Sequence, residues 1–365
     1  MNIYALLVAL VLVTALLMHG YREGNKKYVI VACLLLFAVY GLRDTFVIGG
    51  DTTSSYLHMF ERMANRSWND VLSTSGGENK GFYLLAKAFH QLSGGDYQLF
   101  VTTIAGFVTI CFGNLLYRYS PNPLQSILYH FGLLYFTFYF SVLKQSLAMA
   151  VLMLAFDCLM RGKTLKYFLL VLIAAQFHFP AYVFLLAWPM SKLQIGRNYL
   201  YFLAIMLALT YLLRNQIINL MLNTYKDLED STSNVDISGI TFFRTKALIM
   251  LVIIIAAVVL RKPKPEDHEY STVLEFMGVA LVFQTFCGYN NIFERLADYY
   301  FQYAVIFIPM VFDKKADREP LFNWRVMGIV DLFTPYLFCG FGIVRFLNYV
   351  VSDRTMYPFH FFFES

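Results

Sequence analysis

Apolar runs long enough to cross a lipid bilayer follow one another along almost the whole chain. A transmembrane helix needs about 20 predominantly apolar residues. The predicted spans are residues 3–20, 28–42, 98–117, 124–140, 145–160, 165–190, 198–213, 245–260, 271–290, 299–312 and 326–350. Only 15% of the residues are charged, against about 25% in soluble domains. The sequence therefore predicts an all-α, polytopic transmembrane bundle of about 11–12 spans, with residues 1–365 forming one integral membrane domain.

One of these runs, residues 165–190, is too long for a single upright helix and short for two. Pro180 interrupts it two residues after His178. A proline inside a helix lacks a backbone donor and clashes with the preceding turn. We therefore predict a helix break near His178. Broken or re-entrant helices occur at membrane depth where they line a cavity, and we expect an extracytoplasmic cavity here.

Two hydrophilic stretches, residues 43–97 and 214–244, are predicted to be extracytoplasmic loops. If the N-terminus is outside and the chain breaks near His178, the short basic segments fall in the cytoplasm, as the positive-inside rule requires. The segment RKPKP at 261–265 distinguishes a break near His178 from a single span over residues 165–190. It would move outside if residues 165–190 formed one span.

On this topology the outer face gathers ionisable residues at or inside the predicted membrane boundaries. They are Arg43, Asp44, Asp51, Glu78, Lys144, His178, Arg244 and Arg295. Ionisable groups near hydrocarbon are costly and normally belong to a site. Simpler interpretations stay open, since Arg43 can anchor a helix at the interface, Asp51 can cap a helix and His178 can be a buried core residue.

The chain contains no nucleotide-sugar Rossmann motif, no Walker A motif and no D-x-D metal motif. Its five cysteines lie in apolar runs without a C-x-x-C pair, which is typical of small core residues rather than metal ligands or disulfides. We therefore expect no metal, no cofactor and no nucleic-acid partner.

Five short segments carry the polar residues of the outer face in a recognisable order. They are LRDTFVIGGDTTSSYLHMF with Arg43, Gly50, Asp51 and Tyr56; ENKGFYLLAK with Glu78, Gly81 and Phe82; LKQSLAMAV with Lys144 and Gln145; AQFHFPAYVFL with His178; and ERLADYY with Arg295 and Tyr299. This series resembles the EpsG family of bacterial exopolysaccharide polymerases, relatives of the Wzy O-antigen polymerases. Lys144 stands where the family usually has arginine, and Pro180 where it has serine.

The resemblance implies a metal-independent, inverting glycosyl transfer at the outer face of the bacterial cytoplasmic membrane. A glycan on a polyprenyl diphosphate moves onto a new lipid-linked repeat unit, in exopolysaccharide, capsule or O-antigen biosynthesis. The implied partners are the lipid-linked donor and acceptor, membrane lipid, a chain-length regulator and a flippase. The alternative functions are a transporter or flippase for lipid-linked oligosaccharide and a membrane acyltransferase.

The resemblance also implies roles for individual residues. A carboxylate or histidine must accept the proton of the attacking hydroxyl, and the candidates, in order of preference, are Asp51, Glu78 and His178. Cations and polar groups must hold the diphosphate and the sugars, since arginine suits bidentate phosphate contact. The candidate substrate-binding residues are Arg43, Tyr56, Lys144, Gln145, Arg244, Arg295 and Tyr299.

Overall fold

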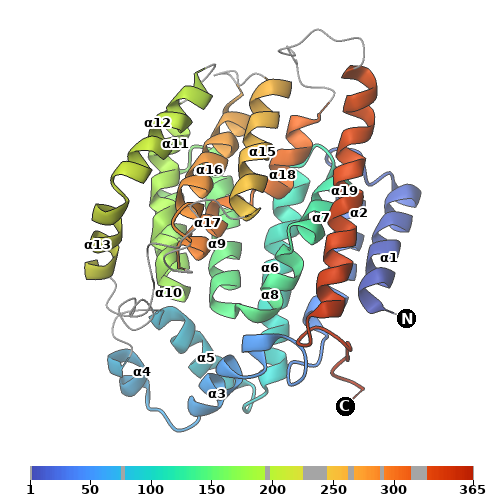
Figure 1. The fold of residues 1–365 in the computed structure, drawn as a ribbon. Coiled ribbons are helices and arrows are strands. Elements are labelled where there is room, and N and C mark those ends of the chain that lie inside the picture. The colour runs from blue at the N-terminus through green and yellow to red at the C-terminus, as the bar shows by residue number, and fades with distance from the viewer. Residues whose placement is uncertain are drawn as a thin grey trace. The chain divides into compact units, whose positions relative to one another are not determined.

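The computed structural model describes residues 2–74, 79–193, 198–224, 245–261, 267–287, 292–313 and 327–364. Within these residues the secondary structure is helical, and the only extended pairing is one isolated bridge (Figure 1). The predicted all-α fold is therefore confirmed. The chain divides into two compact units, Met1–Tyr182 with Val326–Ser365, and Val183–Arg325. Each is described by itself, and a single domain over residues 1–365 stays a prediction.

The first unit contains most of the long apolar helices. They are α1 (Ile3–Met18), α2 (Lys26–Gly41), α6 (Tyr97–Tyr119), α7 (Pro123–Gly132), α8 (Tyr135–Ser141), α9 (Leu143–Met160), α10 (Thr164–Phe177) and α19 (Met327–Ser352). Among the described residues, three helices are long and apolar enough to cross a membrane, at Tyr97–Tyr119, Leu143–Met160 and Thr334–Ser352. Four shorter apolar helices accompany them.

Close helix contacts in this unit depend on small residues. Helix α2 packs on α6, α6 on α9, α9 on α10, and α7 on α19. Where α7 crosses α19, a Cβ added to Gly132 would lie 2.7 Å from the Cα of Gly342. Small residues allow such backbone contact between membrane helices. The Arg345 guanidinium fastens the crossing by donating to the Gly132 carbonyl at 2.8 Å.

The predicted break near His178 is confirmed. Helix α10 ends at Phe177, and His178 adopts an extended backbone with φ −147° and ψ 108°. The chain continues as a 3₁₀ segment, η2 (Phe179–Leu186), and then as α11 (Ala187–Leu193). Pro180 explains the change, because it lacks the N–H that α10 would need to continue. A re-entrant path through the membrane stays a prediction.

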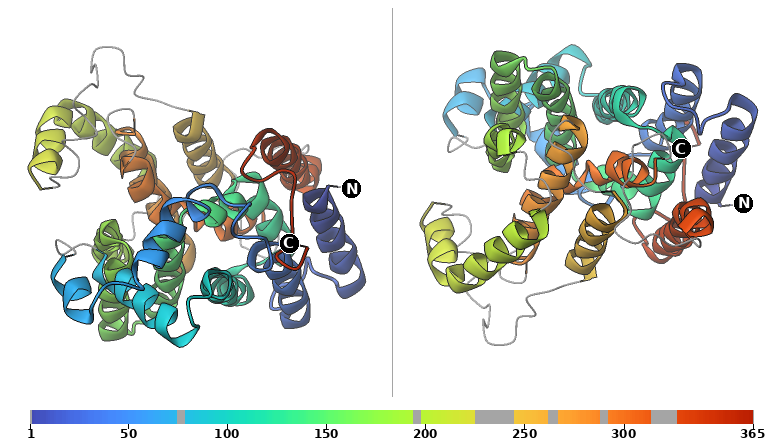
Figure 2. Two further views of the ribbon diagram at one scale, coloured as in Figure 1. Left: turned by 90° about the horizontal axis from the view of Figure 1, so that it is seen from below. Right: turned by 90° about the horizontal axis from the view of Figure 1, so that it is seen from above.

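The described residues of the stretch 43–97, which are 43–74 and 79–97, contain four short helices. They are η1 (Gly50–Thr52), α3 (Ser55–Arg62), α4 (Trp68–Thr74) and α5 (Lys80–Leu92). They gather at one end of the first unit, the lower end in Figure 1, where the C-terminal residues also lie (Figure 2, left). Helix α5 packs on α3, α4, α6 and α10. This end of the unit therefore carries a cap of short helices on the long ones.

The second unit is arranged around α16 (His268–Gln284). Its other helices are α11, α12 (Tyr199–Leu212), α13 (Arg214–Thr224), α15 (Thr245–Leu260), α17 (Ile292–Phe301) and α18 (Ala304–Val311). Helix α16 packs on all of these except α13. In the predicted loop 214–244, α13 covers the first residues, and the rest lies outside the described residues.

Candidate functional site

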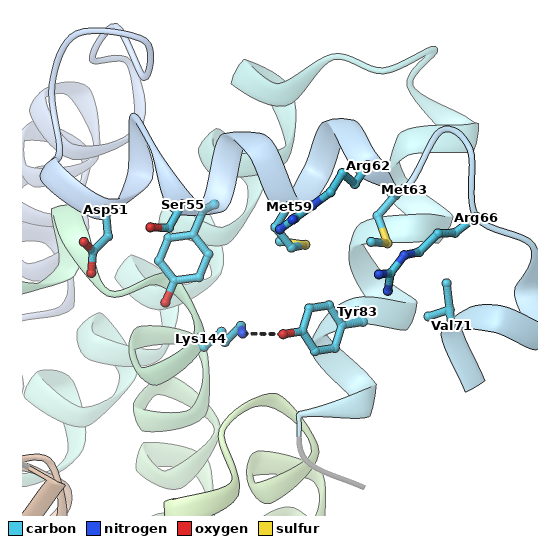
Figure 3. A pocket seen from close by; sticks show the side chains of 10 residues that line it. Asp51, Ser55, Met59, Arg62, Met63, Arg66, Val71, Tyr83 and Lys144 are labelled. Atoms are coloured by element: carbon cyan, nitrogen blue, oxygen red, sulfur yellow. Dashed lines mark hydrogen bonds between the residues drawn. The ribbon is translucent and has the colours of Figure 1, made fainter. Parts of the chain in front are cut away.

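A cavity of about 470 Å³ opens at the capped end of the first unit (Figure 3). Its lining comes from η1, α3, the turn after α3, α4, α5 and the first turn of α9. The lining residues are Asp51, Ser55, Tyr56, Met59, Arg62, Met63, Arg66, Val71, Tyr83 and Lys144. Three of them are cations and one is a carboxylate, so the charged side chains give the cavity a net positive charge.

Helix α3 gives the cavity two different ends. Ser55, Met59 and Arg62 are spaced four and three residues apart, which places them on one face of a helix. Asp51 lies before the start of that face, and Arg62 and Arg66 lie at and beyond its end (Figure 3). Eight helical residues extend over about 12 Å. The carboxylate and the two guanidinium groups therefore stand at opposite ends of an elongated cavity.

The opposite face of α3 explains why the helix sits where it does. Phe60 is 1% exposed and its ring stacks on that of Phe100 at 5.0 Å. Lys87 of α5 is also buried and donates from Nζ to the carbonyl of Met63 at 2.7 Å. Burial of an aromatic side chain typically contributes about 1.5–3 kcal/mol. These contacts fix α3 against α5 and α6 while its polar face lines the cavity.

Lys144 sits in an aromatic cage on the wall of the cavity. Its Nζ donates to the hydroxyl of Tyr83 at 2.9 Å. The same atom lies 4.5 Å from the ring centre of Tyr83, 5.7 Å from that of Phe82 and 6.0 Å from that of Tyr56. An ammonium over aromatic faces is attracted by their negative potential. The cage holds the cation at the cavity without neutralising its charge.

Asp51 lies on a backbone turn that two glycines make possible. Gly49 and Gly50 have φ values of 132° and 53°, which side-chain-bearing residues rarely adopt. A Cβ on Gly49 would also lie 2.9 Å from the carbonyl oxygen of Phe140. The neighbouring Thr52 is held on two sides, since its hydroxyl donates to that same carbonyl and its own carbonyl accepts from the Tyr97 hydroxyl at 2.6 Å. Asp51 itself is exposed in the cavity.

Arg43 does not line this cavity. Its side chain is fully buried, and it donates from Nε to the carbonyl of Ile48 at 3.2 Å and from Nη2 to that of Phe140 at 2.9 Å. Nη1 donates to the carbonyl of Tyr40. The guanidinium carbon also lies 4.6 Å from the ring centre of Phe140. Arg43 therefore binds the backbone of the turn that precedes Asp51.

His178 lies where α10 meets the start of α5, and it is 8% exposed. Asn79, with φ 57°, accepts from the Phe179 amide on its side-chain oxygen at 2.8 Å. A Cβ on Gly81 would lie 2.7 Å from Cβ of Gln176, so α5 touches the end of α10 directly. His178 therefore lies next to the N-terminal end of α5 and does not line the cavity.

The remaining predicted site residues fall in three groups. Gln145 is buried on α9 beside Lys144. In the second unit, Arg295 is exposed on α17, Tyr299 is fully buried, and the neighbouring Asp298 forms an ion pair with Lys246 at 2.7 Å. Glu78 and Arg244 lie outside the described residues. Of the predicted site residues that the structure describes, Asp51, Tyr56 and Lys144 line one cavity, whereas Arg43, Gln145, His178, Arg295 and Tyr299 do not.

Among the lining residues that sequence reasoning missed are the two arginines, Arg62 and Arg66, and Tyr83. The signal for Arg62 was its helical spacing from Ser55 and Met59, which an interpretation of residues 43–97 as a loop could not use. Tyr83 follows Phe82 in the ENKGFYLLAK segment. Arg66 follows the end of α3 and has no comparable pattern.

Comparison with protein families gives a match over most of the chain. The model of the EpsG family matches residues 26–362. The chain belongs to the EpsG family. No curated protein and no solved structure matches it. Membership of the EpsG family, together with the apolar helices, makes the chain an integral membrane protein of polysaccharide biosynthesis, with polymerase activity of the glycosyltransferase type and lipid-linked oligosaccharide substrates.

Residues of four of the five segments that resemble the EpsG family come together in the first unit. Lys144 contacts Tyr56 and Tyr83 through its ammonium, and the start of α5 contacts Phe179 through Asn79. These segments lie far apart in sequence, so only the fold brings them together. The fifth, ERLADYY, belongs to the second unit.

Proposed function

We propose that the chain is a Wzy-type polymerase that transfers a polyprenyl-diphosphate-linked glycan onto a lipid-linked repeat unit at the outer face of the bacterial cytoplasmic membrane. The observation that carries the proposal is the cavity at the capped end, with one carboxylate at one end and two arginines at the other. The predicted topology puts residues 43–97, and therefore the cavity, outside the cytoplasm.

The charges of the cavity suit a diphosphate leaving group. In the reaction, an acceptor hydroxyl oxygen bonds to the anomeric carbon as the bond from that carbon to the diphosphate oxygen breaks. Negative charge then develops on the leaving diphosphate, and fixed cations stabilise it. Arg62 and Arg66 offer planar forks for phosphate oxygens, and Lys144 adds a third positive charge. Attack opposite the leaving group inverts the anomeric centre.

Asp51 is the favoured proton acceptor, because it lines the cavity while His178 does not. A general base must come within hydrogen-bond reach of the proton it removes. Glu78 precedes α5 and stays a second candidate. Tyr56 and Tyr83 offer ring faces on which sugars can stack. Arg244, Arg295 and Tyr299 stay candidates for substrate binding, and a flippase and a chain-length regulator stay proposed partners.

Substitutions at the two ends of the cavity test the proposal by separating binding from chemistry. Asp51→Asn should lower the polymerisation rate by about 10²–10⁴-fold with unchanged affinity for farnesyl diphosphate, a short polyprenyl diphosphate. Arg62→Ala and Arg66→Ala should each weaken that affinity by about 10–10²-fold, since a hydrogen bond to a charged group contributes about 1.5–3 kcal/mol. Arg22→Ala is the control, because Arg22 is exposed in the turn after α1 and does not line the cavity.

Two results would contradict the proposal. Full polymerisation by Asp51→Asn would remove Asp51 as the base, and unchanged farnesyl diphosphate affinity in both arginine variants would remove the anion site. A flippase would give a different phenotype, because its loss traps lipid-linked repeats in the cytoplasmic leaflet. Loss of this chain should instead let single repeats accumulate in the outer leaflet, accessible to a periodate label applied to intact spheroplasts.

A further inference from the structure

The last residues of the chain bind the backbone just before Asp51. We call residues 353–362 the C-terminal strap. Its contacts with residues 42–49 are backbone hydrogen bonds from Gly49 N to Thr355 O at 3.0 Å, from Asp44 N to His360 O at 2.8 Å and from Phe362 N to Leu42 O at 3.1 Å. Arg43 and Phe361 form an antiparallel bridge within this pairing. The strap therefore holds both ends of the segment that leads into the Asp51 turn.

The strap is itself anchored to α1. The Tyr4 hydroxyl donates to the carbonyl of Met356 at 2.9 Å, and both residues are at most 1% exposed. The Tyr4 ring meets the rings of Phe346 and Phe359 edge-on, at 6.0 and 5.6 Å. Buried hydrogen bonds and ring contacts of this kind define a position, in contrast to the fraying that chain ends usually show.

The carbonyl of Phe140 connects this segment to Lys144. It accepts from the Arg43 guanidinium and from the Thr52 hydroxyl, and it lies in α8, which ends at Ser141 just before α9 begins at Leu143. Arg43 thus links the turn that carries Asp51 to the end of α8, which directly precedes α9 and Lys144. Arg43 and Thr52 meet at one carbonyl oxygen, so their positions are linked.

From these contacts we infer that Arg43 and the C-terminal strap are positioning elements, which hold Asp51 at a fixed place in the cavity relative to Lys144. Arg43 then fixes the geometry of the turn and does not contact the diphosphate. As far as catalysis is concerned, it rests on the proposed function of the cavity. Misplacement of a catalytic group by about 1 Å can cost about 10²-fold in rate, so loss of either element should lower the rate without removing the anion site.

A distance measurement tests the inference without depending on activity. Spin labels at Ser54, which follows the Asp51 turn, and at Leu92, the 87% exposed last residue of α5, report the position of the turn. Deletion of residues 353–365 should broaden or shift the distribution of distances between the labels. Deletion of residues 363–365 alone is the matched control, because it leaves all three backbone hydrogen bonds of the strap in place. An unchanged distribution in the longer deletion overturns the inference.

Kinetic measurements on full-length variants give a second test. They remain informative if the truncated chain does not fold. Arg43→Met should lower the polymerisation rate by about 10²-fold, with farnesyl diphosphate affinity within about twofold of the parent, and Arg43→Lys should restore part of the rate because one ammonium can still donate to a carbonyl. Loss of affinity equal to that in Arg62→Ala would overturn the inference, since Arg43 would then act as a ligand. If the deletion of residues 353–365 shifts the distance distribution but polymerisation stays complete, the strap does position the turn. Asp51 is then not the base.

Discussion

Substitution of Lys144 tests whether this residue binds substrate or only connects two helices. Its ammonium contacts the Tyr83 hydroxyl at 2.9 Å and the Tyr83 ring at 4.5 Å. If Lys144 only anchored α5 to α9, removing either partner would cost the same contact. If Lys144 also binds the diphosphate, only the loss of the cation should weaken binding. Lys144→Met and Tyr83→Phe therefore form an informative pair.

The structure sets the expected magnitudes. Lys144→Met keeps the length of the side chain and removes one charged donor, which is worth about 1.5–3 kcal/mol to a charged partner. Because a tenfold change in affinity corresponds to about 1.4 kcal/mol, the dissociation constant for farnesyl diphosphate should rise by about 10–10²-fold. Tyr83→Phe keeps the ring beneath the ammonium and removes only the hydroxyl, so the constant should stay within about threefold. Both variants should lose a similar, small amount of thermal stability.

The assay is titration of farnesyl diphosphate into protein in nanodiscs at about 0.15 M salt, because exposed charge interactions depend on ionic strength. Lys80→Met is the control, since Lys80 begins α5 next to the cavity but does not line it. Equal affinities for Lys144→Met and the parent, with a matching stability loss in both test variants, would refute substrate binding by Lys144. The cage would then be a helix contact only.

Three further predictions follow from the packing and the topology. Gly81→Val should destabilise the protein by about 1–3 kcal/mol and weaken farnesyl diphosphate binding. The reason is that its Cβ would lie 2.7 Å from Cβ of Gln176 and displace α5. A thermal melt measures the first effect and the same titration measures the second. Gly132→Ala should cost a similar amount of stability through its contact with Gly342, yet leave the binding constant unchanged, because α7 does not line the cavity. An impermeant thiol reagent should label a cysteine at Leu92 in intact cells and one at Glu23 only after lysis; the reverse pattern would invert the predicted topology.

The long apolar elements could be predicted from sequence because hydropathy acts over many residues. The end of α10 could also be predicted, because Pro180 lacks the backbone N–H that a continuing helix needs. Helix α10 does end at Phe177. Helix α3, within residues 43–97, could not be predicted in the same way. Helix α3 has only eight residues, and such a helix is marginal without tertiary contacts. Its stability comes from partners distant in sequence, such as Phe100.

The candidate site was accessible to sequence reasoning only in part. Asp51, Tyr56 and Lys144 were expected to act together, and they line one cavity. Arg43 was expected at the substrate because a charge at a membrane boundary indicates a site. The structure instead surrounds it with the carbonyls of Tyr40, Ile48 and Phe140. Chain breaks expose such carbonyls, and no residue pattern shows where they will point.

The layout of the cavity favours a particular direction for the reaction. Arg62 and Arg66 lie at the far end of α3 from Asp51, and Lys144 lies on the wall with the aromatic rings (Figure 3). An inverting displacement needs its base and its leaving group on opposite sides of the anomeric carbon. If the arginines hold the diphosphate, the acceptor hydroxyl must approach from the Asp51 end. The donor lipid and the acceptor would then enter from opposite ends of one cavity, so neither substrate needs to leave before the other binds.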